Sequence, residues 1–182
     1  MPVVRNEDGF VLPFIAILLM VLFLVGAIIL DVGSFYLRHG ELQPLVKQSA
    51  NAGMLKFSDA MEIKAEENKS AQCMVEEPPA VCSSENMFDF LTSGEVVDLV
   101  GSPTVQEAVS DASISFLITY DPQLIIGNED IQITFPYEYE GVFELQIQVI
   151  VSDTPQRFLG GIFPVTDDEI QVHAISYIAT PF

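Results

Sequence analysis

The feature that most constrains this chain is a long run without charge near its start. Residues 10–30 are 21 consecutive residues with no charged side chain. As an α-helix rising 1.5 Å per residue, the run is about 31 Å long, which matches the hydrocarbon core of a bilayer. A secretory signal is the alternative, but its apolar region is shorter and a small-residue cleavage site would follow. The sequence therefore predicts a retained transmembrane helix over residues 10–30, after a short segment over residues 1–9.

The charges of the chain are unevenly distributed. Six of the seven basic residues precede residue 70, and beyond it Arg157 alone faces eighteen acids. The formal net charge is −19 for the chain. A domain this acidic is repelled by phosphate backbones and anionic headgroups, so nucleic-acid binding is disfavoured and the lipid bilayer is contacted through the span alone.

The two cysteines help to predict on which side of the membrane the part after the span lies. Cys73 and Cys82 are separated by eight residues that include Pro78 and Pro79, which favour a reversal of the chain. They form no CxxC motif and have no nearby histidine, so a metal site is disfavoured. We predict a disulfide in an exported domain, with two unpaired thiols as the alternative. The charges beside the span barely decide its orientation, whereas the disulfide and the acidity place the C-terminal part outside the cytoplasm.

Helical periodicity continues beyond the span. It predicts an extramembrane helix over residues 31–67, with a bend around residues 40–44 because Pro44 cannot donate to the carbonyl of Gly40. The apolar or small stripe of this helix packs either on the chain's own domain or on a partner helix, and the spacing leaves both open. The stripe comprises Leu42, Leu45, Val46, Ser49, Gly53 and Phe57.

Residues 68–112 are predicted to form a connector with the cysteine loop. Within it we expect a short helix over residues 85–91 and breakers at 92–94 and 101–103. A second short helix is expected over residues 104–110, with Thr104 as its N-cap and Glu107 three residues later.

Residues 113–182 are predicted to form a β-rich head. Polar and apolar residues alternate in several segments, which favours an antiparallel sheet with one packed face. The long helix is expected to cover that face, so the predicted fold class is α+β. The predicted strands span residues 114–120, 131–135, 143–149 and 170–177.

The sequence offers little for catalysis. It has no phosphate-binding glycine loop, nucleophile elbow or zinc motif, so we expect neither an enzyme nor a cofactor. His173 lies in a strand pattern, where a hydrogen bond at the sheet face is the expected role. Acidic clusters at 128–130 and 167–169 lie in predicted turns and match no recognised calcium loop. A calcium- or ligand-binding sensor domain on a membrane anchor is the alternative function. Asn68 begins a glycosylation sequon, a triplet that is common by chance.

Three stretches together resemble a known family. The first is Gly9 and Phe10, which enter the span. The second is residues 27–38, which carry an Asp-Val-Gly pattern that begins at residue 31 and lead to the small-residue run 49–53. The third is residues 149–174, which contain two strand patterns around a Phe- and Gly-containing connection. This combination is similar to TadG-like (TadE/TadG-like) proteins of the Flp, or tight adherence, pilus system, over about 100 residues.

The resemblance implies a single-pass inner-membrane protein with a periplasmic or extracellular head that serves pilus assembly through contacts with other pilus subunits. Homo-oligomerisation stays open. Pilin-like members carry Glu five residues after a processing glycine, but that position after Gly9 is Phe14. We therefore expect an anchored accessory or minor subunit. The predicted interface residues are Asp31, Gly33, Tyr36, Leu42, Gln43, Ala50 and Gly53.

Overall fold

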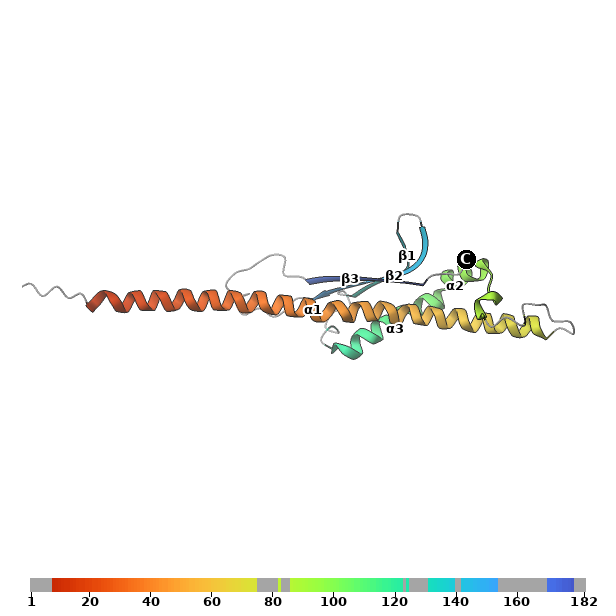
Figure 1. Ribbon diagram of the computed structural model, residues 1–182, viewed down its shortest axis with the longest axis horizontal. Helices are drawn as coiled ribbons and strands as arrows, with labels where there is room; N and C mark the ends of the chain where they lie inside the picture. The colour runs from red at the N-terminus through yellow and green to blue at the C-terminus, as the bar shows by residue number, and fades with distance from the viewer. Residues whose placement is uncertain are drawn as a thin grey trace, which may run out of the picture. The chain divides into compact units, whose positions relative to one another are not determined.

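The computed structural model describes residues 8–74, 82, 86–122, 124, 131–139, 142–153 and 170–178 (Figure 1). These residues form an α+β structure that is mostly helical and includes a three-stranded antiparallel sheet. The elements in chain order are α1 (Asp8–Cys73), the 3-10 helix η2 (Met87–Phe90), α2 (Ser93–Gly101), α3 (Pro103–Tyr120), β1 (Ile131–Tyr139), β2 (Val142–Asp153) and β3 (Ile170–Ile178).

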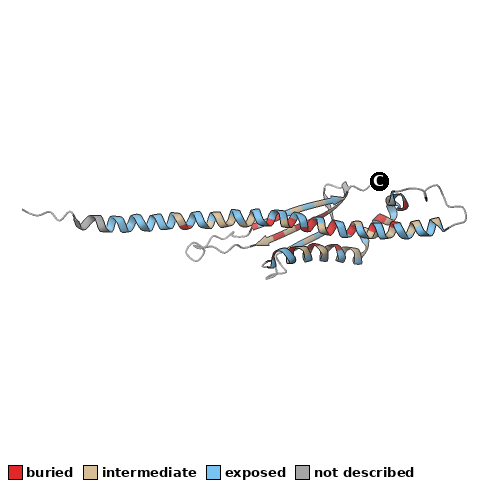
Figure 2. Ribbon diagram, turned by 60° about the horizontal axis from the view of Figure 1, so that its bottom comes forward, coloured by how far each residue is buried: buried red, intermediate tan, exposed pale blue. Residues whose placement is uncertain are grey.

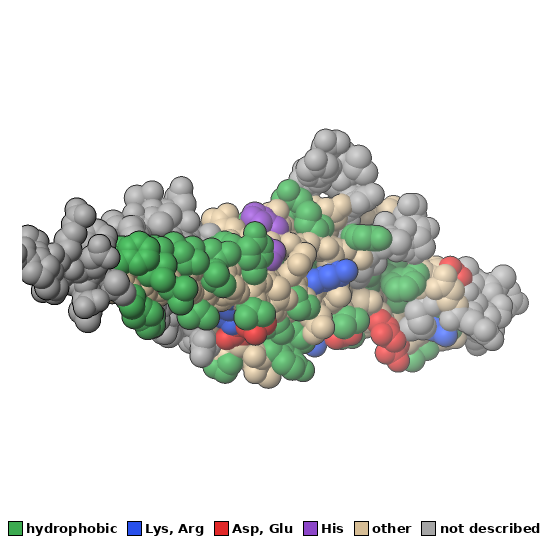
Figure 3. Space-filling view, turned by 60° about the vertical axis from the view of Figure 1, so that its left-hand side comes forward, with side chains coloured by type: hydrophobic (Ala, Val, Ile, Leu, Met, Phe, Trp, Pro, Cys, Tyr) green, Lys and Arg blue, Asp and Glu red, His purple; other side chains and the backbone are tan. Residues whose placement is uncertain are grey.

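The chain divides into two units. The anchor unit comprises Met1–Gly40 and Thr154–Ile170, and the head unit comprises Glu41–Asp153 and Gln171–Phe182. In the anchor unit, α1 is long and apolar enough to span a membrane, and only 6% of its most apolar window is buried. Figure 3 shows the apolar side chains of this part of α1 gathered on the surface. A core helix of a soluble protein would instead have most of this surface covered.

The core of the head unit is built on one stripe of α1. The buried side chains recur every three or four residues, the period of an α-helix, so they lie on one face of it (Figure 2). The predicted stripe is confirmed in this part of α1, and it extends further than expected, to Met61 and Ala65. Its buried members are Leu42, Val46, Ser49, Ala50, Gly53, Met54, Phe57, Met61 and Ala65.

The sheet has the order β1-β2-β3. Strands β1 and β2 are antiparallel, and Ile133 pairs with Val149 on the inner face. Val149 and Val172 are buried, and the ring centroids of Phe57 on α1 and Phe135 on β1 lie 5.2 Å apart. The strands predicted at 131–135, 143–149 and 170–177 are confirmed, and each is longer than expected.

The strand predicted at residues 114–120 is wrong, because these residues belong to α3. Ile114, Phe116 and Ile118 have high β-propensity, which favoured a strand. The buried residues of α3 are Val109, Ser113 and Leu117, spaced by four, so tertiary packing overrides propensity.

The helix predicted at 104–110 starts elsewhere than expected. Ser102 is the N-cap of α3 and Pro103 occupies the first turn, so Thr104 is not the cap. Proline suits that position because its missing N–H would have no intrahelical partner there. Residues 92–94 were expected to be a breaker, but Thr92 caps α2, which was not predicted. The short helix at 85–91 is present as η2.

Helix α1 ends later than predicted, at Cys73 instead of residue 67, and it continues through Pro44. The bend at residues 40–44 stays a prediction. The division of the chain into segments 1–9, 10–30, 31–67, 68–112 and 113–182 likewise stays a prediction.

Candidate functional site: a membrane anchor, a close helix crossing and a disulfide clasp

The exposed apolar part of α1 ends in a polar and aromatic boundary. The hydroxyl of Ser34 donates to the carbonyl oxygen of Asp31 at 2.8 Å, just past the uncharged run. The rings of Phe35 and Tyr36 meet edge to face with centroids 6.1 Å apart, and Tyr36 is exposed. Aromatic residues with a polar tip are enriched where a helix leaves the hydrocarbon. This boundary therefore has the composition expected at a membrane surface.

Helices α1 and α3 approach closely at Gly53. A Cβ added to Gly53 would lie 2.7 Å from Cδ1 of Ile147 and 3.2 Å from the carbonyl oxygen of Val109, and it would overlap Oγ of Ser113. The glycine thus lets α3 and β2 reach the α1 backbone at the same point. Ser49 and Gly53 form the small-x-x-x-small spacing that permits such close helix contacts.

Two serines beside Gly53 differ in their hydrogen bonding. The hydroxyl of Ser49 donates to the carbonyl oxygen of Ser113 at 2.9 Å across the crossing, and both residues are fully buried. The Ser113 hydroxyl has no hydrogen-bond partner among the described residues. A buried hydroxyl without a partner is costly, so the Ser113 hydroxyl adds no hydrogen-bond stabilisation to the crossing.

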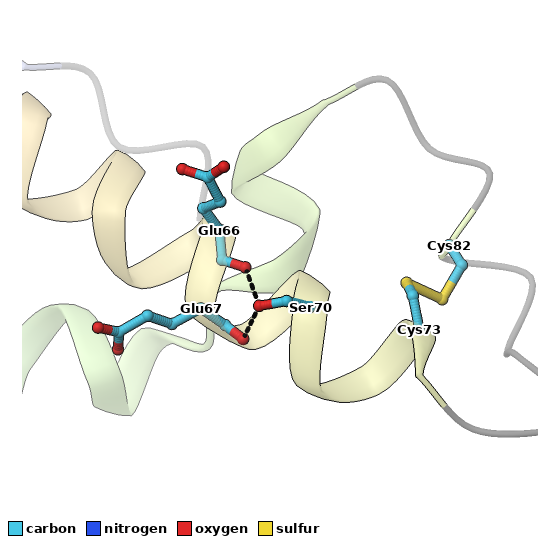
Figure 4. Close-up of a disulfide and its surroundings, with 5 residues drawn as sticks. All are labelled: Glu66, Glu67, Ser70, Cys73 and Cys82. Carbon is cyan, nitrogen blue, oxygen red and sulfur yellow. Dashed lines mark hydrogen bonds between the residues drawn. A yellow bond between two sulfur atoms is a disulfide. The ribbon is translucent and has the colours of Figure 1, made fainter.

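The C-terminal end of α1 is held by a disulfide. Cys73 and Cys82 are bonded, with Cα atoms 5.7 Å apart, which confirms the predicted pairing (Figure 4). One turn earlier, the Ser70 hydroxyl donates to the carbonyl oxygens of Glu66 at 2.8 Å and Glu67 at 2.9 Å. The disulfide closes the loop that begins at the helix end.

Loss of this disulfide should lower the stability of the head unit. For a loop of this length, the chain-entropy model gives about 2–3 kcal/mol of stabilisation. We expect the Cys73→Ser/Cys82→Ser variant to unfold at lower urea than the oxidised wild type, and reductant to shift only the wild type. Identical unfolding midpoints for the wild type and the variant, each with and without reductant, would contradict the prediction.

Asn68 joins α1 to the segment that leads into α2. Its side-chain amide donates to the carbonyl oxygen of Phe90 at 2.9 Å and to Oε1 of Glu95 at 2.8 Å. Lys69 lies over the Phe90 ring, with its Nζ 5.3 Å from the centroid. Both amide hydrogens of Asn68 are used, so the sequon that begins there has a structural role in the folded chain.

Glu95 connects this junction to the start of α2. Its carboxylate accepts from the backbone N–H and the hydroxyl of Thr92, and the Thr92 hydroxyl accepts from the Glu95 N–H, which completes a capping box. The pKa of Glu95 lies below its ordinary value of 4.5, chiefly because of the Thr92 N–H and then the Asn68 amide. Hydrogen bonds to the charged form favour that form.

The junction should therefore weaken in acid. A carboxyl with a depressed folded pKa contributes stability that is complete above about 4.5 and is lost as the pH falls through the folded pKa. We expect the protection factors of the α2 amides, which are corrected for the pH dependence of intrinsic exchange, to be lower below pH 4.5 than above it, and this pH effect to be smaller in Glu95→Gln. Glu107→Gln, on exposed α3 surface, is the matched control. An unchanged α2 profile in Glu95→Gln would contradict the prediction.

The predicted interface residues fall into three groups by burial. Leu42, Ala50 and Gly53 are buried within the head unit, so the stripe of α1 packs on the chain's own domain and not on a partner helix. Tyr36 and Gln43 are exposed, and their role in partner contacts stays a prediction. Asp31 and Gly33 are half-buried, and their role in partner contacts also stays a prediction. Sequence reasoning missed Ser113, Asn68 and Glu95, although the Thr-x-x-Glu spacing that ends at Glu95 is a readable capping signature.

The described residues contain no group of three or more His, Cys, Asp or Glu side chains that could hold a metal ion. The acidic clusters at 128–130 and 167–169 lie outside the described residues, so the calcium alternative is untested. His173 is exposed on β3, and the hydrogen bond expected there stays a prediction.

In the part of the chain that the structure describes, these features define a class of protein: an α+β chain with one helix able to span a membrane, a disulfide and a packed helix–sheet head. Comparisons with known protein families, with characterised proteins and with solved structures found no match.

Proposed function

We propose that this protein is a membrane-anchored structural component of a Flp/Tad-type pilus assembly system, either an accessory subunit or a minor pilin-like subunit. It crosses the inner membrane once and acts through protein contacts, without catalysis. The exposed apolar length of α1 is the observation that carries the anchored part of the proposal. The pilus part is supported by the residue patterns around Asp31 and residues 149–174.

The head lies in the periplasm or outside the cell. Disulfides persist in oxidising compartments and are rare in the cytosol, which supports this location for Cys73 and Cys82. The acidity of the chain supports it too, because such a surface stays in water and away from anionic headgroups. The contacts with other subunits are made by exposed positions of α1, of which Tyr36 is the most prominent apolar one near the span.

The proposal is tested by deleting the chain's gene in its native host. We expect fewer surface filaments and weaker adherence, with both restored by the wild-type gene. Tyr36→Ala should restore them poorly, because it removes an exposed side chain from the predicted interface. Leu55→Ala, which truncates an exposed side chain of α1 in the head unit, is the matched control and should restore both. Normal filaments and adherence in the deletion strain would refute the proposed function.

A further inference from the structure

The two edges of the sheet differ in their protection. Strand β1 contains Pro136, which has no N–H to donate, and its pairing with β2 shifts register between Thr134 and Tyr137 and again before Tyr139. Helix α3 also packs against β1. Proline, irregular register and a covering helix are devices that keep an edge strand from pairing with another chain.

The composition of strand β3 offers less protection. Its nine residues include no proline, no glycine and no Asp, Glu, Lys or Arg. Among the described residues its hydrogen-bonded neighbour is β2 alone. On its outer face Ile175 and Tyr177 are exposed, by 46% and 69%, while Val172 on the inner face is buried and fixes the strand. Such an edge is a template for strand addition.

Strand β3 is also held by a hydrogen bond to helix α1. The hydroxyl of Ser176 donates to the side-chain oxygen of Asn51 on α1 at 2.7 Å, which joins the C-terminal half of the strand to the helix. A strand that is held in place loses little further freedom when a partner pairs with it, and such preorganisation favours binding.

The charge of the chain decides what kind of strand would pair. Beyond residue 70, one arginine faces eighteen acids, so this part of the chain carries a formal charge near −17. A second copy would bring an equal negative charge to the edge, whereas a basic partner would be attracted to it. We propose that the edge of β3 opposite β2 accepts an extended strand from another protein, and that this strand is uncharged along its length and carries lysine or arginine at its ends.

The probe is a short peptide of alternating valine and threonine with a lysine at each end, added to the full chain in lipid nanodiscs. Alternate β3 amides point to the edge opposite β2, so they should exchange rapidly in the protein alone and become protected when the peptide binds. The same peptide with terminal glutamates should bind at least about tenfold more weakly at low salt, and the difference should shrink as salt is added.

Two variants locate the site. Ile175→Lys adds a positive charge on β3 and should weaken binding of the lysine peptide at least about tenfold. Gln132→Lys adds the same charge on exposed β1 and should change binding less than about twofold, which controls for net charge. Gln171→Lys, on the same face of β3 as Ile175, replaces the first variant if that one unfolds.

Three results would overturn the proposal. Protection of every β3 amide in the protein alone would mean that the chain covers its own edge. Equal affinity for the lysine-ended and the glutamate-ended peptide would show that the partner strand need not be basic. Protection that grows with protein concentration in the absence of peptide would identify a second copy as the occupant. Because none of these readouts involves filaments, the inference can fail while the proposed function holds, and the reverse is also true.

Discussion

The Gly53→Leu variant should lose the packed structure of the head unit. An added Cβ alone would meet Ser113, Ile147 and the Val109 carbonyl, so there is no room for a branched side chain. Since α3 and β2 both contact α1 at this point, neither can withdraw without uncovering the core. We expect a loss on the order of 4 kcal/mol or more, which is exceptional for one substitution and follows from overpacking at a backbone contact. Urea unfolding followed by near-ultraviolet circular dichroism measures it.

The smaller Gly53→Ala change gives a graded version of the same result. Alanine favours a helix over glycine by roughly 1 kcal/mol, so an open position should gain stability. At Gly53 the overlap should outweigh that gain and leave a net loss of about 1–2 kcal/mol.

The matched control is Gly40→Ala, on the same helix. Nothing described lies within 4 Å of the Cβ that it would add. We expect it to be neutral or to stabilise by up to roughly 1 kcal/mol. If Gly53→Ala and Gly40→Ala changed stability in the same direction, the close crossing would not exist as described.

The contrast between these glycines shows what the sequence can and cannot predict. The spacing of Leu42, Val46 and Phe57 is a local property, and it predicts a helix with one apolar face. Whether that face meets the chain's own sheet or a partner depends on residues more than fifty positions away, such as Ser113 and Ile147. Sequence spacing left that choice open, and contacts such as those at Gly53 resolve it.

The same limit explains the error in α3. Residues 114–120 favour a strand by propensity, while the helix is stabilised by burial of Val109, Ser113 and Leu117 against other elements. The three later strands were predictable because polar and apolar residues alternate in them, which keeps their buried residues on one face. The disulfide was predictable because Cys73 and Cys82 lie nine positions apart and have neither a CxxC spacing nor a nearby histidine for a metal site.

The transmembrane assignment leads to the other large expected effect. Replacing Leu18 and Leu22 by arginine should abolish stable membrane integration. Both side chains point outward from α1, so the substitutions disturb no packing within the chain. Each arginine near the centre of a span costs about 2.5–3.5 kcal/mol, and each lost leucine removes about 0.5 kcal/mol more. A pair should therefore cost about 6–8 kcal/mol, enough to reverse insertion. Carbonate extraction of isolated membranes measures the outcome.

The matched control uses a second leucine of α1 whose side chain is equally exposed. Leu22 and Leu55 lie on the same helix and are both 66% exposed, so in water alone their substitution by arginine would have similar effects. Only a bilayer around residues 10–30 distinguishes them. Leu55→Arg, alone or with Ile63→Arg, should leave membrane integration unchanged. If the Leu18→Arg/Leu22→Arg chain stayed in carbonate-washed membranes to the same extent as the Leu55→Arg chain, α1 would not cross the hydrocarbon at residues 10–30, and the anchored part of the proposed function would have to be abandoned.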